Sequence, residues 1–207
     1  MPKLGVGVLA SGRGSNFEAL VKATRKEAID AEVRVLVVNV PDAAALKRAE
    51  AMDIPAVVLD HREYGKRSEF EKAVVAQLNQ HDVRLVCLAG FMRILSPFFV
   101  EHYRNHVMNI HPSLLPAFGG LQGIDVHRAV IESGAKVSGC TVHFVSEEVD
   151  AGPIIVQRTI PVREEDTPDS LAVRILLEEH RAYPEAVRLF SENRLKVEGR
   201  RVSVLGS

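Results

Sequence analysis

Short apolar runs that alternate with helical patterns constrain the fold of this chain more than any other feature of its sequence. Five runs are continuous and rich in Val, Ile and Leu, as expected of strands buried on both faces. Because helical patterns fall between the runs, the order predicts an α/β fold with a doubly wound, mainly parallel sheet and helices on both faces. The expected strands are Lys3–Ala10, Val33–Val38, Ala56–Leu59, Leu85–Ala89 and Val107–Ile110.

Capping residues mark where the helices between these strands begin. Each of four segments offers either a side chain that can accept a hydrogen bond from the first free amides or a Pro at the first helical position. The expected starts are Ser15 or Asn16 for a helix to about Lys26, Asp42 for AAALKRAEAM, a capping box at Ser68–Glu71 for a helix ending near Gln80, and Ser96-Pro97.

The pattern changes after Gly120, where we expect antiparallel strands to be added to the sheet. Two apolar runs joined by SEEVDAGP can pair with each other, and a long helical pattern follows them. The expected elements are a helix at Asp125–Ser133, strands at Val137–Val145 and Pro153–Ile160, a helix from Thr167 that bends or ends near Pro184, and a hairpin turning at Glu198-Gly199.

Composition is that of a soluble globular protein. Of 207 residues, 46% are hydrophobic and 26% charged, and the formal net charge is -1, so no general attraction to nucleic acid is expected. No apolar run approaches a membrane span, and MPKLGVGVLASG is broken too early for a signal peptide. Cys87 and Cys140 stand inside apolar runs and are expected to be buried thiols. We therefore expect a cytoplasmic enzyme or binding protein.

A glycine-rich turn, ASGRGSN, joins the first strand run to the first helix. Glycines let a ligand approach the backbone closely, and the free amides of a helix start attract anions. The turn lacks the third glycine of the dinucleotide fingerprint and the Gly-Lys-Ser/Thr ending of a P-loop. We expect it to bind a phosphate; the alternative is a tight turn that binds nothing.

Two polar residues stand at the end of the fifth apolar run. Because side chains alternate along a strand, Asn109 and His111 point to the same side, at the edge where α/β sheets bind ligands. An Asn amide can stabilise an oxyanion, and a His can move a proton. Asp150, in a loop bounded by Gly and Pro, could pair with His111 and raise its pKa. Alternatively, His111 is a structural residue and Asp150 a solvated acid.

The same residues favour direct attack by a substrate group over a covalent enzyme intermediate. Ser113 lies close to His111, but no G-x-S-x-G nucleophile elbow surrounds it. The eight histidines are scattered without metal-ligand spacing, so no metal is expected.

Five segments together resemble one family. ASGRGSNFEAL, LAGFMRILSP, MNIHPSLLPAF, TVHFVSEEVDAGPII and EEHRAYPEAV occur in the order and spacing of the phosphoribosylglycinamide formyltransferases of purine biosynthesis, to about residue 200. The resemblance implies a formyltransferase-like, Rossmann-related fold. It also implies transfer of a formyl group from the co-substrate 10-formyltetrahydrofolate to the glycine amine of 5'-phosphoribosylglycinamide. The single domain 1–207 would comprise a phosphate- and nucleotide-binding half, 1–106, and a catalytic and folate-binding half, 107–207.

The resemblance assigns the chemistry to three residues. Asn109 and His111 match the catalytic pair, and Asp150 matches the acid that raises the pKa of the histidine and keeps it protonated near neutral pH. The amine would attack the formyl carbon directly, and Asp150 would hold a water that relays the proton. His143 matches a supporting residue, with a structural role equally open.

The resemblance also implies two groups of binding residues. Glu179 matches the acid near the substrate amine, with Glu178 close enough to be confused with it. The substrate-binding residues are Gly12, Arg13, Gly14, Ser15, Asn16 and Glu179. The folate-binding residues are Arg67, Met92, Arg93, Ile94, Leu95, Asn109, Ser146, Glu147, Glu148, Val149 and Asp150.

The chain departs from the family pattern after HPSLLP. Ala117 stands where others often carry a polar or basic residue, and FGGLQGIDVHRAV is longer than in some relatives. We expect His127, within that stretch, on a helix surface or in its packing.

Three rival functions remain. A methionyl-tRNA formyltransferase needs a C-terminal RNA-binding domain, for which 207 residues leave no room. A 10-formyltetrahydrofolate hydrolase needs a water site and usually a regulatory domain. A nucleotide-binding regulatory domain would keep the glycine-rich turn without requiring Asn109, His111 and Asp150 together. The expected partners are small molecules, with no membrane or nucleic acid, and the chain is expected to be a monomer or a weak homodimer.

Overall fold

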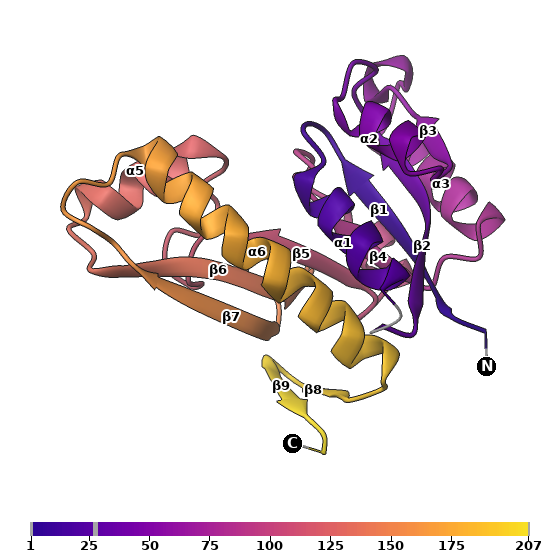
Figure 1. Ribbon diagram of the computed structural model, residues 1–207. Coiled ribbons are helices and arrows are strands. Elements are labelled where there is room, and N and C mark those ends of the chain that lie inside the picture. Colours follow the sequence, from indigo (N-terminus) through magenta and orange to yellow (C-terminus); the bar gives the residue numbers. More distant parts are fainter. Residues whose placement is uncertain (1, 27–28, 207) are drawn as a thin grey trace.

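The five apolar runs form neighbouring parallel strands in the computed structural model, which describes residues 2–26 and 29–206. Those residues form one seven-stranded sheet in the order β3-β2-β1-β4-β5-β6-β7 (Figure 1). The predicted parallel sheet is therefore confirmed. Its parallel strands are β1 (Leu4–Ala10), β2 (Ala31–Val38), β3 (Ala56–Val58), β4 (Leu85–Leu88) and β5 (Val107–His111).

Two antiparallel strands extend this sheet beyond β5, as predicted. They are β6 (Val137–Phe144) and β7 (Ile154–Pro161). The register of β5 with β6 places Asn109 opposite His143 and His111 opposite Thr141. The expected C-terminal hairpin is also present, as β8 (Leu195–Glu198) and β9 (Arg201–Val204). The β5–β6 register brings a third polar side chain to the end of β5.

Helices cover both faces of the sheet, so the doubly wound prediction is confirmed. Leu36 of β2 packs in one core with Phe17 and Tyr183, while the adjacent Val37 packs on the other face with Phe70 and Phe99. This alternation follows from the two-residue period of a strand. The helices are α1 (Ser15–Arg25), α2 (Ala45–Ala51), η1 (His61–Glu63), α3 (Arg67–Gln80), α4 (Pro97–His102), α5 (Ile124–Glu132) and α6 (Pro168–Ser191).

The expected cap of α2 is wrong. Asp42 does not cap this helix, which begins at Ala45 with no side-chain cap. The amide of Ala45 instead donates to the carbonyl of Gly12 at 3.0 Å. A tertiary backbone contact thus takes one of the free amides that a side-chain cap would otherwise satisfy.

The expected capping box of α3 is also wrong. The helix begins at Arg67 with no side-chain cap, one residue before Ser68. The Glu71 carboxylate turns away and accepts a hydrogen bond from the amide of Ser96 at 2.8 Å. Ser96 does precede α4 with Pro97 at the first helical turn, as predicted. Glu71 therefore joins α3 to the start of α4.

The long helix α6 does not end at Pro184. A Pro inside a helix removes a hydrogen bond and costs about 3 kcal/mol. The preceding residue, Tyr183, is fully buried, and its hydroxyl oxygen lies 2.9 Å from the carbonyl oxygens of Leu88 and Met108 on β4 and β5. These tertiary contacts stabilise the helix across the proline, and α6 runs along β6 and β7 (Figure 1).

Both cysteines are buried free thiols, as their position inside apolar runs predicted. Burial raises the pKa of Cys87 and of Cys140 to about 12. In the part of the chain that the structure describes, no helix has the length and apolar character needed to cross a bilayer. The same part contains no group of three or more His, Cys, Asp or Glu side chains arranged to hold a metal ion.

Candidate active site

A cavity of about 760 Å³ lies at the carboxyl ends of β1, β4 and β5. Ligands bind at this edge of open α/β sheets, and small-molecule sites typically measure about 300–1,000 Å³. The cavity brings together most of the residues that the sequence singled out. Those that line it are Gly12, Arg13, Gly14, Ser15, Asn16, Met92, Arg93, Ile94, Leu95, Asn109, His111, His143, Ser146, Glu147, Val149, Asp150 and Glu179.

The glycine-rich turn is held open by backbone geometry. Gly14, rather than Ser15 or Asn16 as expected, is the N-cap of α1, and its φ of 72° favours glycine. A Cβ at this position would also collide with α2. The carbonyl of Arg13 accepts a hydrogen bond from Arg48 Nε at 2.8 Å. No side chain caps α1, so its first amides remain available for an anion.

Asn16 and Glu179 form a buried pair on the cavity wall. Asn16 Nδ2 donates to Glu179 Oε2 at 2.7 Å, which joins α1 to α6. Burial raises the pKa of Glu179, opposed by this hydrogen bond and by the charge of Arg13. Asn16 Oδ1 is buried without a hydrogen-bond partner among the described residues. The Asn16–Glu179 pair can therefore accept hydrogen bonds from a ligand. Glu178, the alternative to Glu179, instead forms an ion pair with Arg181 at 2.7 Å.

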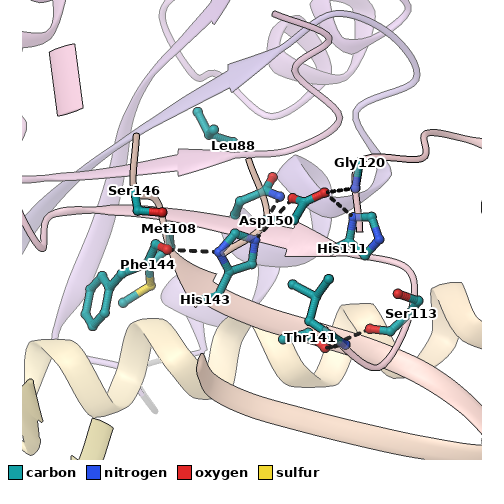
Figure 2. A network of polar contacts seen from close by, with 12 residues as sticks. Leu88, Met108, His111, Ser113, Gly120, Thr141, His143, Phe144, Ser146 and Asp150 are labelled. Carbon is teal, nitrogen blue, oxygen red and sulfur yellow. Dashed lines mark hydrogen bonds and ion pairs between the residues drawn. The ribbon is translucent and has the colours of Figure 1, made fainter. Parts of the chain in front are cut away.

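Asn109, His111, His143 and Asp150 form one polar network at the end of β5, and Figure 2 shows Asp150 between the two histidines. Asp150 Oδ2 lies 3.4 Å from His111 Nδ1, and Oδ1 lies 3.6 Å from His143 Nε2. His143 Nδ1 donates to the carbonyl of Phe144 at 2.9 Å. Its Nε2 can therefore accept from Asn109 Nδ2 at 3.2 Å, which fixes the orientation of that amide.

His111 has an acceptor near each ring nitrogen. Nε2 lies 3.2 Å from the carbonyl oxygen of Phe118, and Nδ1 faces Asp150. Burial lowers the pKa of His111, although Asp150 and Phe118 oppose the shift. Asp150 thus acts on the pKa of His111 in the predicted direction, although burial outweighs the carboxylate and the net shift is downward. The two acceptors can nevertheless hold an imidazolium once a proton arrives, because both of its nitrogens donate.

Asp150 is positioned by a tight loop. Its φ is 54°, and its Oδ2 accepts a hydrogen bond from the amide of Gly120 at 2.9 Å. Burial alone would raise the pKa of Asp150, but the neighbouring His143 side chain and the amide of Gly120 outweigh burial and lower it. The carboxylate is therefore ionised at neutral pH. Two residues later, a Cβ on Gly152 would collide with the carbonyl oxygen of Phe144.

Gly152→Ala is expected to destabilise this loop. The added methyl group forces the backbone away from Phe144, and overpacking of this kind costs about 1–3 kcal/mol. For a chain of this size, that corresponds to a fall in melting temperature of roughly 2–12 °C by calorimetry. The control is Gly65→Ala, where the methyl group would meet only Glu69 Oε2, at 3.7 Å. Equal melting temperatures for the two variants would contradict the close-contact argument.

The segment after β4 supplies a partly apolar wall. The side chains of Met92 and Ile94 are 53% and 58% exposed, whereas Leu95 is buried. The Arg93 guanidinium lies 5.6 Å from the centre of the Phe70 ring. Exposed apolar side chains beside a cavity are suited to a flat apolar ligand.

Two predicted binding residues lie outside the cavity lining. Arg67 Nε lies 3.4 Å from Glu71 Oε1, at the start of α3. Glu148 is in the loop before Asp150, and its carbonyl accepts a hydrogen bond from Ser146 Oγ at 2.8 Å. The roles of Arg67 and Glu148 stay predictions.

Sequence reasoning missed a further wall, formed by α5 and α6. His127 was expected on a helix surface or in its packing; it is buried, and it lines the cavity. Burial lowers its pKa, as does the nearby His111, while Asp169 opposes the shift. The sequence did contain a signal for this wall, because the α6 residues that line the cavity recur at helical spacing on the same face as Glu179. The α6 residues that line the cavity are Asp169, Ala172, Val173, Leu176 and Glu179.

Comparison with known proteins identifies relatives over most of the chain. The formyl transferase family profile matches residues 5–187. The phosphoribosylglycinamide formyltransferase of Bacillus subtilis is 42% identical over 87% of this chain and 91% of its own length. The phosphoribosylglycinamide formyltransferase of Escherichia coli is 38% identical over 94% of this chain and 90% of its own length. The trifunctional purine biosynthetic protein adenosine-3 of Gallus gallus is 47% identical over 94% of this chain, which spans only 19% of that protein.

Solved structures of related proteins share the fold of this chain. The glycinamide ribonucleotide transformylase 1 of Symbiobacterium toebii is 46% identical, with a TM-score of 0.94 over 98% of this chain and 94% of its own. A formyltetrahydrofolate deformylase of Pseudomonas syringae is 27% identical, with a TM-score of 0.87 over 98% of this chain but 66% of its own. The chain therefore belongs to the formyl transferase family, among its phosphoribosylglycinamide formyltransferases.

Proposed function

We propose that this protein transfers a formyl group from 10-formyltetrahydrofolate to the glycine amine of 5'-phosphoribosylglycinamide, a step of de novo purine biosynthesis. The observation that carries the proposal is one cavity lined both by the glycine-rich turn and by Asn109, His111 and Asp150. The names of the bacterial relatives support the same activity. We expect a cytoplasmic monomer or weak homodimer that acts on small molecules without a metal.

The cavity has suitable groups for both substrates. The free amides at the start of α1 would bind the phosphate of the ribonucleotide, and Asn16 with Glu179 would accept hydrogen bonds from its donor groups. The segment around Met92 and Ile94 would hold the folate ring system. On this assignment, 1–106 contributes mainly the phosphate site, and 107–207 contributes the catalytic residues.

The reaction forms one C–N bond and breaks another. The amine nitrogen of the ribonucleotide attacks the formyl carbon, and the formyl oxygen becomes an oxyanion that the Asn109 amide would stabilise. When the tetrahedral intermediate collapses, the bond from the formyl carbon to the folate nitrogen breaks. A proton leaves the amine and ends on that folate nitrogen, so the products are a formamide and tetrahydrofolate.

The His111–Asp150 pair would carry this proton. Burial lowers the pKa of His111, which favours its neutral form, and a neutral imidazole can accept the proton lost by the amine. The resulting imidazolium then has Asp150 at 3.4 Å and the Phe118 carbonyl at 3.2 Å to hold it. Its positive charge would add to the stabilisation of the oxyanion. Neutral His111 can donate to one of these two acceptors, and the imidazolium formed during attack can donate to both.

A two-substrate absorbance assay tests the proposal. Purified protein is mixed with the ribonucleotide and a 10-formylfolate donor, and deformylated folate is followed by absorbance. We expect a signal only when both substrates are present. A signal without the ribonucleotide would indicate a hydrolase, the activity suggested by the name of the Pseudomonas relative. No signal from folded protein would contradict both activities.

Glu179→Ala is expected to raise KM for the ribonucleotide about tenfold or more with little change in kcat. The variant removes a buried hydrogen-bond acceptor, and leaving the donor of a ligand unpaired costs about 1–3 kcal/mol. Steady-state kinetics with varied ribonucleotide provide the measurement. Glu178→Ala is the matched control, because Glu178 pairs with Arg181 and Arg158. A larger effect from the Glu178 variant would contradict the assignment of Glu179.

A further inference from the structure

We infer that Ser11 and Asn39 are positioning residues that connect the glycine-rich turn to the segment after β4, so that binding of one substrate strengthens binding of the other. The inference rests on the proposed function, which assigns the ribonucleotide phosphate to the turn and the folate to the segment. No part of the proposed chemistry uses either side chain.

Ser11 bonds to the folate-side segment at two points. It directly follows β1, and its backbone amide donates to the carbonyl of Gly90 at 3.1 Å. Its hydroxyl oxygen accepts a hydrogen bond from the amide of Met92 at 2.9 Å. The pairing of β1 with β4 is thus extended past the ends of both strands, into the two loops that border the cavity.

Asn39 fixes the direction of the Ser11 hydroxyl. The Ser11 hydroxyl donates to Asn39 Oδ1 at 2.6 Å, and Asn39 is only 2% exposed. His61 Nδ1 lies near Asn39 as well, 3.2 Å from its Nδ2 and 3.0 Å from its backbone carbonyl oxygen. A hydroxyl has one proton, so donation to Asn39 leaves the lone pairs of its oxygen for Met92. Ser11 therefore joins loops that follow β1, β2 and β4.

Neither loop can shift far without affecting these bonds. On one side, the carbonyl of Gly12 accepts from the amide of Ala45, which ties the turn to α2. On the other, Met92 carries a half-exposed side chain at the cavity. Ordering of one loop by its ligand would therefore order the other. Such coupling is reciprocal and typically changes affinity about 5- to 150-fold.

Substrate coupling can be measured without turnover. Tetrahydrofolate has no formyl group to transfer, so its Kd can be determined by titration calorimetry with and without saturating ribonucleotide. We expect the ribonucleotide to lower the Kd of tetrahydrofolate at least about fivefold in the unaltered protein. Ser11→Ala should reduce this ratio to near one, and Asn39→Ala should reduce it in part. Ser11→Thr, which retains the hydroxyl, should restore it.

The outcomes separate this inference from the proposed function. Ser133→Ala is the control and should leave the ratio unchanged, because the hydroxyl of Ser133, the C-cap of α5, donates to the carbonyl of Val130 at 2.7 Å. If the unaltered protein binds both ligands and Ser11→Ala leaves their coupling intact, the inference alone is overturned. If the Kd of tetrahydrofolate in the unaltered protein is the same with and without the ribonucleotide, the inference alone is likewise overturned. If the unaltered protein binds neither ligand, the proposed function fails, and the inference fails with it.

Discussion

Asn109→Ala is expected to lower kcat about 100- to 1,000-fold. The Asn109 amide borders the cavity at the end of β5, and its orientation is fixed by His143 at 3.2 Å. A fixed donor aimed at a developing oxyanion contributes about 2.7–4 kcal/mol to transition-state stabilisation, which corresponds to this loss of rate. Because the interaction strengthens in the transition state, kcat should fall more than KM rises. Steady-state kinetics with both substrates varied provide the measurement.

The matched control for this variant is Asn79→Ala. Asn79 lies on α3, and its Oδ1 is 3.5 Å from the Tyr103 hydroxyl, away from the cavity lining. Both variants should retain the circular dichroism spectrum of the unaltered protein. If kcat of Asn109→Ala stays within threefold of the unaltered value, Asn109 does not stabilise the oxyanion.

Asp150→Asn is expected to lower kcat about 100- to 10,000-fold, the range that general acid–base groups contribute. The amide is nearly the same shape as the carboxylate, and its oxygen can still accept the hydrogen bond from Gly120. It has no charge to hold the His111 imidazolium, however. The loss should therefore appear in the chemical step, measured under single-turnover conditions with both substrates bound. Unchanged single-turnover rates would contradict the role of Asp150.

The mechanism also predicts how kcat/KM depends on pH and how Asp150→Asn changes that dependence. Burial lowers the pKa of His111, and Asp150 partly opposes that shift. If neutral His111 accepts the proton, kcat/KM of the unaltered protein should fall as pH drops through this lowered pKa, below about 6.5. Loss of the Asp150 carboxylate lowers the pKa of His111 further, so the acidic limb should move to lower pH in the variant. A shift to higher pH would contradict the mechanism.

The strands were predictable because burial on both faces leaves continuous apolar runs. Leu85–Ala89 is such a run, and Val33–Val38 is interrupted only by Arg34. The ends of both runs lie within two residues of the ends of the observed strands β4 and β2. Helix caps were less predictable because distant residues compete for them. The Gly12 carbonyl bonds to α2 in place of Asp42, and Ser96 takes the Glu71 carboxylate from α3. Neither Gly12 nor Ser96 is close in the sequence to the cap that it displaces, so neither effect could be read from neighbouring residues.

The parts of the candidate site that lie on one strand or one turn were predictable from the sequence. Asn109 and His111 share β5, and the glycine-rich turn follows β1, so strand order alone brings them to one edge. The contact of His143 with Asn109 depends on the β5–β6 register, which the runs of apolar residues did not specify. The net direction of the His111 pKa shift was not predictable from the sequence, because it depends on burial, a property of the whole fold.

Transfer of a labelled formyl group tests the central claim most directly. The protein is incubated with a folate donor carrying ¹³C in its formyl group and a ribonucleotide carrying ¹⁵N in its glycine amine. Formyl transfer to the amine predicts a one-bond ¹³C–¹⁵N coupling in the NMR spectrum of the product. This product should form much more slowly with Asn109→Ala. Recovery of the ¹³C label as free formate, with the amine unmodified, would contradict formyl transfer to the ribonucleotide.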